Sequence, residues 1–305
     1  MLYLKPNTIG YSPYNALSLA KASKLAYLDK TTVTNKLYGN INQLHFFDKR
    51  NTQAFIAANN EFVVISFRGT EPRNLKDWMN NTRISLIPGY GGSVHRGFSE
   101  ALDDIWDEIV MLLSQFQDKN QPIFLTGHSM GGALATMTAV RLGEKYYQHI
   151  QGIYTFGCPR MGDGKFVENY DKIFSDTIED GCQRHRTFRM VNHRDIVTRL
   201  APRSFGYQHV GGCWFFDSEG KLHNDIRYWQ QFLETAKGTR EEFLNVVSLV
   251  EDHNLDEYKK NVLLNFDVIN TPINLINIRS TQNSLMDMAL KQATTNPAIT
   301  SNISF

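Results

Sequence analysis

Apolar and polar residues alternate along this 305-residue chain in blocks that predict helices and strands in turn. A first helix is predicted from an N-cap at Ser12 to about Leu28, because a proline follows Ser12 and apolar residues then recur at helical spacing. Two β-rich segments, 53–57 and 61–68, come next. The Asn59–Asn60 pair between them tolerates the positive φ angles of a tight turn, so these segments are predicted to form a hairpin.

The middle of the chain continues the alternation. Apolar residues repeat at steps of three and four over 99–117 and predict one long amphipathic helix. The elements predicted after it are a strand at 122–126, a helix from the next turn to about Tyr147, a strand at 152–156, a helix near 166–174 and a strand at 186–192. This order predicts an α/β fold with a central, mostly parallel sheet flanked by helices.

The chain shows no internal repeat and no Pro- or Gly-rich linker that would divide it. Residues 1–264 are therefore predicted to form a single domain. Residues 265–305 are rich in Asn, Thr and Ser and have weak periodicity. They are predicted to form a peripheral or poorly ordered tail.

Composition excludes several classes of protein. The 32 Lys and Arg residues nearly balance 31 Asp and Glu residues, giving a net charge of +1, so binding to nucleic acid through a basic surface is not expected. Apolar residues make up 42% and charged residues 21% of the chain, which excludes wholesale disorder. No apolar run approaches the roughly 18–20 residues of a transmembrane helix, and no transmembrane segment is predicted.

Two further features bear on location and redox chemistry. The first ten residues lack the regions of a cleavable signal peptide, so the protein is expected to be cytoplasmic or to be exported without a cleaved leader. Cys158, Cys182 and Cys213 are odd in number and have no Cys-x-x-Cys spacing. They predict neither a disulfide framework nor a zinc site, and inert thiols are expected.

A Gly-x-Ser-x-Gly sequence, Gly127–Gly131, lies on the sharp turn between the predicted strand 122–126 and the helix after it. Such a turn exposes the Ser129 hydroxyl only if its neighbours are small, and Gly132 and Ala133 extend the run of small residues. The alternatives are a Gly-rich phosphate-binding turn and an ordinary tight connection. Neither a Gly-x-Gly-x-x-Gly sequence nor a Walker lysine supports the first of them.

Taken together, six sequence blocks resemble the class 3 lipases, the fungal-lipase-like branch of the α/β-hydrolases, over roughly residues 13–262. The blocks are Val63–Thr70, Val94–Phe98, Thr126–Ala135, Thr155–Asp163, Val191–Val197, and Asp252–His253 with Tyr258. The departures are Cys158, where Ser or Asn is commoner in the family, and Thr198, where many members have Pro. The second departure removes a rigid turn after the predicted acid.

The resemblance implies a catalytic triad of Ser129, Asp195 and His253, in the chain order found in this fold. Two oxyanion donors are also implied: the backbone N–H of Met130, at the start of a helix, and Thr70. Other readings stay open at two positions. Asp195 could be a surface residue paired with an arginine, Arg194 or Arg199, and Thr70 could cap the segment that follows it.

Two histidines compete for the role of base. His209 is close to Asp195 in sequence, but its surroundings are typical of a strand or hairpin where the ring would pack or bond to backbone. His253 follows a predicted helix over 241–250 and is expected on a polar loop, free to reach between Ser129 and Asp195. The pattern therefore favours His253.

A lid is implied between Thr70 and the next block. Over 71–85, Leu75, Trp78 and Met79 share one helical face, which could cover the site or lie on lipid, although an ordinary surface helix has the same pattern.

The function that follows is that of a serine carboxylic-ester hydrolase of lipase type. It would cleave acyl esters of glycerolipids, triacylglycerol or monoacylglycerol first among them, through an acyl-enzyme, with no metal or organic cofactor. Phospholipase A1 and galactolipase activities are alternatives, because loops choose the head group. A non-catalytic lipid-binding protein and a thiol enzyme are alternatives from other classes. The expected partner is a lipid or acyl ester, either dissolved or at a lipid–water interface, and the sequence indicates no oligomeric state.

Overall fold

The computed structural model describes residues 1–8, 10–50, 52–70, 85–117, 120–146, 149–177, 183–199, 201, 203–224 and 252–266. Met1–Asn265 forms one compact unit. The predicted lid, the predicted helix at 241–250 and nearly all of the predicted tail lie outside the described residues.

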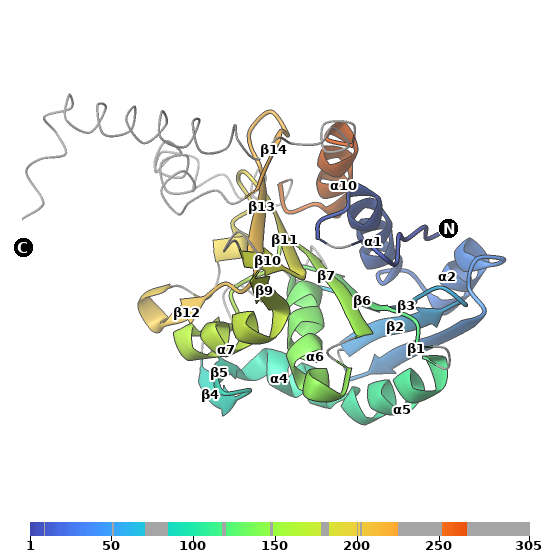
Figure 1. The fold of residues 1–305 in the computed structure, drawn as a ribbon, viewed down its shortest axis with the longest axis horizontal. Helices are drawn as coiled ribbons and strands as arrows, with labels where there is room; N and C mark the ends of the chain where they lie inside the picture. Colours follow the sequence, from blue (N-terminus) through green and yellow to red (C-terminus); the bar gives the residue numbers. More distant parts are fainter. Residues whose placement is uncertain are drawn as a thin grey trace, which may run out of the picture. The chain divides into compact units, whose positions relative to one another are not determined.

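The main sheet carries the site and has eight strands among the described residues, in the order β1-β2-β3-β6-β7-β11-β13-β14 (Figure 1). Their bounds are β1 Gln43–Lys49, β2 Thr52–Ala58, β3 Val63–Phe67, β6 Ile123–His128, β7 Ile150–Phe156, β11 Thr187–Asn192, β13 Gly212–Phe216 and β14 Leu222–Asn224. The five strands from β3 to β13 run parallel to one another, whereas β1, β2 and β14 join antiparallel at the two edges. The predicted mostly parallel sheet is confirmed.

The remaining elements pack around this sheet. The helices are α1 Pro13–Leu25, α2 Lys30–Leu37, α4 Arg96–Asp103, α5 Trp106–Phe116, α6 Met130–Tyr146, α7 Gly164–Phe174 and α10 Leu255–Leu264, with short 3-10 turns at Val197–Arg199 and Arg203–Phe205. A smaller sheet contains β12 Tyr207–Gln208, β8 Gly162–Asp163, β5 Gly92–His95 and β4 Leu86–Gly89, and a ribbon pairs β9 Ser175–Thr177 with β10 Gln183–His185. Of these short strands, only β12 lies in a segment for which the sequence predicted a strand or hairpin, the surroundings of His209.

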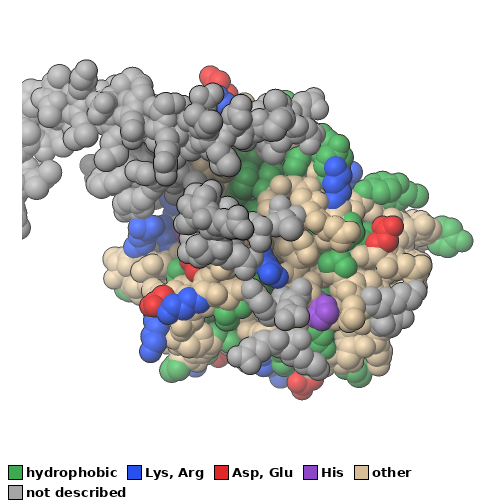
Figure 2. All heavy atoms as spheres, viewed as in Figure 1, with side chains coloured by type: hydrophobic (Ala, Val, Ile, Leu, Met, Phe, Trp, Pro, Cys, Tyr) green, Lys and Arg blue, Asp and Glu red, His purple; other side chains and the backbone are tan. Residues whose placement is uncertain are grey.

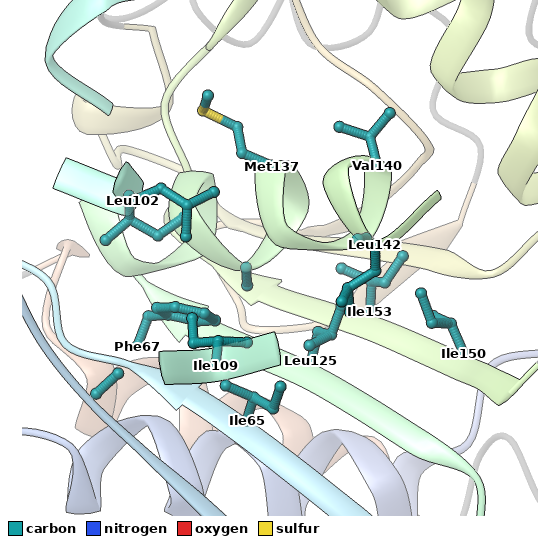
Figure 3. Packing of buried hydrophobic residues seen from close by; sticks show 14 of the residues in the cluster. Ile65, Phe67, Leu102, Ile109, Leu125, Met137, Val140, Leu142, Ile150 and Ile153 are labelled. Carbon is teal, nitrogen blue, oxygen red and sulfur yellow. The ribbon is translucent and has the colours of Figure 1, made fainter. Parts of the chain in front are cut away.

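Apolar side chains fill both faces of the main sheet. Along β3, Ile65 and Phe67 enter the cluster formed with α4, α5, α6 and α7, while Val64 enters a second cluster with α1 and α10. Figure 3 shows the first cluster, with Leu102 and Ile109 meeting side chains from the strands and from α6. Helices on both faces of a parallel sheet are the layers that the alternating pattern predicted.

The surface is mixed in charge. Figure 2 shows basic and acidic side chains scattered among polar and hydrophobic ones on the face that it presents, which agrees with the near-zero net charge. Of the helices in the described part of the chain, none is long and apolar enough to cross a membrane.

The N-terminal predictions hold with two changes. The Ser12 side chain caps α1 as expected, but this helix ends at Leu25 rather than near Leu28. Segments β2 and β3 pair as a hairpin, yet the turn between them does not use positive φ angles. Instead, the Asn59 side chain accepts hydrogen bonds from the backbone N–H groups of Glu61 and Phe62, so the side chain closes the turn.

One long helix over 99–117 was a wrong prediction. The structure has α4 and α5 with a break at Asp104 and Ile105, where the Ile105 backbone leaves the helical region at φ −122° and ψ 2°. Apolar residues of both helices enter the same core, so the periodic pattern continued across the break. Periodicity reports which face is buried and does not reveal a change of helix direction.

Candidate active site

Ser129 lies at the sharp turn between β6, which is buried along its whole length, and the first residue of α6. Its φ of +58° is in the left-handed region, which a non-glycine residue occupies only at a cost of about 1–3 kcal/mol. The Ser129 backbone N–H donates to the Phe156 carbonyl at 2.9 Å, and the Ser129 carbonyl accepts from Gly132 at 2.9 Å. These bonds hold the strained turn in place.

The small residues around this turn are required by close backbone contacts. A Cβ atom on Gly127 would lie 2.1 Å from the Gly131 carbonyl oxygen, and one on Gly131 would lie 2.2 Å from the Phe67 carbonyl oxygen. At Gly132 it would lie 2.9 Å from Cβ of Cys158 on the neighbouring strand's extension. The prediction that this turn requires small residues is confirmed.

Asp195 and His253 are brought together from positions 58 residues apart. The carboxylate Oδ2 of Asp195 lies 2.9 Å from Nδ1 of His253, and its Oδ1 accepts the Val197 backbone N–H at 2.9 Å. Asp195 is only 1% exposed, which is not the position of a surface residue in an ion pair. Since Oδ2 can only accept from an N–H, this bond orients the imidazole with Nε2 free for a reacting group.

Tyr258 of α10 is a third partner of Asp195. Its hydroxyl donates to Oδ2 at 2.5 Å and accepts the Asn192 backbone N–H at 3.0 Å. Burial by itself raises the pKa of Asp195, but the His253 charge and the hydrogen bonds from His253 and Tyr258 outweigh it and bring the pKa below the usual value. The carboxylate is therefore ionised at neutral pH, as a group that stabilises an imidazolium must be.

Thr198 stands after Asp195, where a proline would make the turn rigid, and it stabilises this turn by a hydrogen bond instead. Its hydroxyl donates to the Asp195 carbonyl at 2.8 Å, within the 3-10 turn Val197–Arg199. The departure from the family pattern therefore leaves the loop held by a side chain.

The Phe156–Gly157 backbone connects the Ser129 turn with the His253 ring. The carbonyl that accepts the Ser129 N–H belongs to Phe156, and Gly157 is the next residue. The Cα of Gly157 faces the His253 ring. Ser129 Oγ and His253 Nε2 are both buried, and neither has a hydrogen-bond partner among the residues described. The hydrogen bond between a nucleophile and its base is often long or poorly aligned without substrate and tightens when substrate binds. His253 lies in a turn just before α10 and is 5% exposed, so its ring is held in the interior.

The side chains of the two residues that are predicted to supply oxyanion donors lie in contact. Thr70 follows β3, Met130 begins α6, and the Thr70 hydroxyl contacts the Met130 sulfur at 4.0 Å. The Met130 N–H lies at a helix N-terminus, where the helix dipole favours negative charge. The arrangement offers a nucleophile, a base held by an acid, and donors for a developing oxyanion, which are the requirements of acyl transfer.

Gly157 leaves the space through which the base and the acid touch. A Cβ atom there would lie 2.6 Å from Asp195 Oδ2 and 2.8 Å from His253 Nδ1, at a φ of +61°. Gly157→Ala should therefore separate these groups and lower kcat by roughly 10²-fold. Gly143→Ala is the matched control, because it has φ +48° with nothing within 4 Å. Equal loss of activity in both variants, measured with a soluble ester, would refute the contact.

His128, just before Ser129, is fully engaged in the interior. Nδ1 lies 2.9 Å from the Tyr27 hydroxyl, and Nε2 lies 2.6 Å from the His253 carbonyl oxygen. Burial, with a smaller effect of the His253 charge, lowers the pKa of His128 to about 3. Its ring therefore stays neutral across the physiological range.

This shift predicts acid sensitivity. Above about pH 6.5 neither the folded nor the unfolded chain protonates His128, but between pH 6.5 and about 3 the unfolded chain takes up a proton that the folded one does not. Folding stability should thus fall as pH falls, by about 3 kcal/mol at pH 4 from this group. Urea unfolding of His128→Gln at pH 7 and pH 4 should show a smaller difference than the unchanged protein; an identical difference would contradict a neutral buried His128.

The competing candidates are differently placed. His209 is fixed by a hydrogen bond from Nε2 to the Thr198 carbonyl at 2.8 Å, and burial with nearby arginine charges lowers its pKa well below the usual value. The predicted bond from this ring to backbone is confirmed. Cys158 is buried, which raises its thiol pKa to about 12, and Cys213 is half-buried. A thiol with so high a pKa is a poor nucleophile at neutral pH.

Leu75, Trp78 and Met79 of the predicted lid, and Cys182, lie outside the described residues. In the parts of the chain that are described, no group of three or more His, Cys, Asp or Glu residues could hold a metal ion. Neither Tyr27 nor the His128 side chain was among the predicted site residues.

Comparison with known proteins agrees with this geometry. The family described as Lipase (class 3) matches residues 64–205. A secreted mono- and diacylglycerol lipase of Malassezia restricta is 34% identical over 174 residues, 53% of this chain and 54% of that protein. A triacylglycerol lipase of Arabidopsis thaliana is 29% identical over 255 residues, 65% of this chain and 48% of that protein. This chain spans about half the length of these relatives.

The fold has a counterpart among solved structures. The Rhizomucor miehei triacylglyceride lipase superimposes with a TM-score of 0.57 at 23% identity, covering 69% of this chain and 82% of that one. The α/β-hydrolase fold is thereby shown. The segment that matches the class 3 lipase family contains both Ser129 and Asp195, so the chain is similar to class 3 lipases over residues 64–205.

Proposed function

We propose that this protein is a serine carboxylic-ester hydrolase of lipase type that cleaves acyl esters of glycerolipids through an acyl-enzyme. The observation that carries the proposal is the Asp195–His253 hydrogen bond beside the strained Ser129 turn. A serine hydroxyl needs a base to become nucleophilic, and the base needs an acid to fix its tautomer.

The reaction would proceed in two stages. Ser129 Oγ attacks the ester carbonyl while His253 Nε2 takes its proton, and the oxyanion is stabilised by donors at Met130 and Thr70. His253 then returns the proton to the leaving alcohol. Water, activated by the same imidazole, releases the fatty acid and restores the Ser129 hydroxyl. Asp195 remains ionised throughout and stabilises the imidazolium.

The substrate class is supported by the names of the relatives, which are mono- and diacylglycerol lipases and triacylglycerol lipases. Fatty-acid release from monoolein, triolein, phosphatidylcholine and a galactolipid by the purified protein tests it. Release from the two acylglycerols with little from the polar lipids is the expected result. Faster release from phosphatidylcholine or the galactolipid would replace this proposal with phospholipase A1 or galactolipase activity, and no release from any of them would favour a non-catalytic lipid-binding protein.

The location of this reaction also belongs to the proposal. Of the two predicted locations, export is supported by the name of the Malassezia restricta relative, which describes a secreted protein. Activity measured separately in medium and in washed cells distinguishes the two.

The lid hypothesis carries its own prediction. If the helical face of Leu75, Trp78 and Met79 covers the site and moves onto lipid, activity should rise several-fold when the ester exceeds its solubility limit. Trp78→Ser should lose this rise while keeping activity on dissolved ester. Equal activity of the unchanged protein on either side of the solubility limit would reject the lid hypothesis and would leave the proposed ester hydrolysis unaffected.

A further inference from the structure

His128 uses both ring nitrogens to connect separate parts of the site. On one side its Nδ1 meets the hydroxyl of Tyr27, which follows α1, at 2.9 Å. On the other side its Nε2 meets the backbone carbonyl of His253 at 2.6 Å. The rings of the two histidines lie 4.4 Å apart at 31°.

The hydrogen-bond roles follow from these partners. A carbonyl oxygen only accepts, so the proton of His128 sits on Nε2 and is donated to His253. A neutral imidazole then has Nδ1 as an acceptor, and it receives the Tyr27 O–H. Burial raises the pKa of Tyr27 and keeps that hydroxyl protonated. The contacts therefore fix one tautomer of His128.

The chain of hydrogen bonds reaches the oxyanion residue. The Gly69 backbone N–H bonds to the Tyr27 oxygen, and a Cβ atom on Gly69 would lie 2.4 Å from that oxygen. Gly69 immediately precedes Thr70. Hydrogen bonds thus run from the segment that carries the predicted oxyanion donor, through Tyr27 and His128, to the backbone of His253.

A second side chain anchors the neighbouring carbonyl. Nδ2 of Asn192, at the end of β11, donates to the Asp252 carbonyl at 2.9 Å. Consecutive carbonyls before α10 are therefore held by side chains at the ends of two strands, β6 and β11. Rotation of this backbone would move the His253 ring relative to Ser129, and a displacement near 1 Å costs roughly 10²-fold in rate.

We propose that Tyr27 and His128 are positioning residues, which hold the backbone of the base His253 and the Gly69–Thr70 segment in register with Ser129. The inference rests on the proposed hydrolase function. Neither residue is assigned contact with substrate, and His128 acts through the carbonyl of His253 rather than by exchanging protons.

Three substitutions separate positioning from simple packing. His128→Gln places an amide N–H where Nε2 was and keeps the donor to His253, whereas His128→Leu removes it. Tyr27→Phe leaves His128 and its bond to the His253 carbonyl but removes the O–H donor to Nδ1. We expect kcat to fall roughly 10–100-fold in His128→Leu with KM changed less than about threefold, to recover most of that loss in His128→Gln, and to fall several-fold in Tyr27→Phe.

A spectroscopic measurement tests the tautomer without relying on turnover. In nitrogen-15 NMR of histidine-labelled protein, His128 should show a proton on Nε2 only, unchanged from pH 5 to pH 9, and Tyr27→Phe should shift its Nδ1 signal. The titratable groups that face this ring are Tyr27, His253, Asp195 and Tyr258. Assignment uses His128→Gln, which removes the signal.

The outcomes are distinct. Wild-type kcat in His128→Leu, or a His128 ring that titrates between pH 5 and pH 9, would overturn the inference while leaving the hydrolase proposal intact. If His128→Leu fails to fold, Tyr27→Phe and His128→Gln decide: equal kcat in Tyr27→Phe and the unchanged protein overturns the inference. Absence of hydrolysis in the unchanged protein would instead reject the proposed function, while the tautomer measurement would still report on the hydrogen bonds.

Discussion

Replacing Ser129 with alanine should abolish ester hydrolysis, lowering kcat by roughly 10⁴–10⁶-fold. This substitution removes only the hydroxyl group. In the described part of the chain, no other serine has a positive φ like the +58° of Ser129. Hydrolysis of p-nitrophenyl butyrate measures the loss. Activity that persists in Ser129→Ala would remove Ser129 as the nucleophile.

Substitutions at Ser129 should also show that the serine conformation required for catalysis lowers the free energy of unfolding. Ser129 Oγ has no hydrogen-bond partner among the described residues and its backbone is strained. Ser129→Ala should therefore be as stable as the unchanged protein, and Ser129→Gly should be about 1 kcal/mol more stable, because glycine relieves the positive φ. Urea unfolding tests both. Destabilisation of both variants would mean that loss of activity reports on folding.

His253→Ala should be essentially inactive, with kcat lower by several powers of ten, while His209→Ala keeps measurable turnover. His253 Nδ1 bonds to Asp195 and its Nε2 is left for the proton of Ser129. His209 is committed to a backbone carbonyl instead.

His253 is buried and His209 is half-buried, so folding must be measured in both variants. Each variant removes an imidazole that packs in the fold, and each is expected to lose some stability. Comparing kcat at a temperature where circular dichroism shows both variants folded removes this difference. An active His253→Ala beside a folded but inactive His209→Ala would show that the other histidine is the base.

The features that sequence predicted well are local ones. The strand, turn and helix around Ser129 are contiguous, and their small residues follow from contacts within a few positions, at Gly127 and Gly131. The pattern of buried residues also predicted both faces of the sheet. Backbone sterics and periodicity act over short stretches, so a single sequence displays them directly.

What could not be predicted depends on residues distant in sequence. Tyr27 meets His128 across 101 positions, and His128 meets the His253 carbonyl across 125. No periodicity links such residues. Tyr258 had a signal, since it stands in the last block of the family resemblance, but its bond to Asp195 appears only in the fold. The burial of His253 could not be predicted for the same reason, because polar neighbours in sequence do not reveal what packs over a ring.

The most direct test of a Ser129 nucleophile activated by His253 and Asp195 is covalent labelling with diethyl p-nitrophenyl phosphate. Ser129 Oγ would attack phosphorus and release p-nitrophenolate, while His253 takes the proton. We predict one diethylphosphoryl group per chain, located on Ser129 by mass spectrometry, with no labelling in Ser129→Ala and a rate at least roughly 10³-fold lower in His253→Ala. Labelling at another residue, or at an unchanged rate in His253→Ala, would contradict a nucleophile at Ser129 activated by His253 and Asp195.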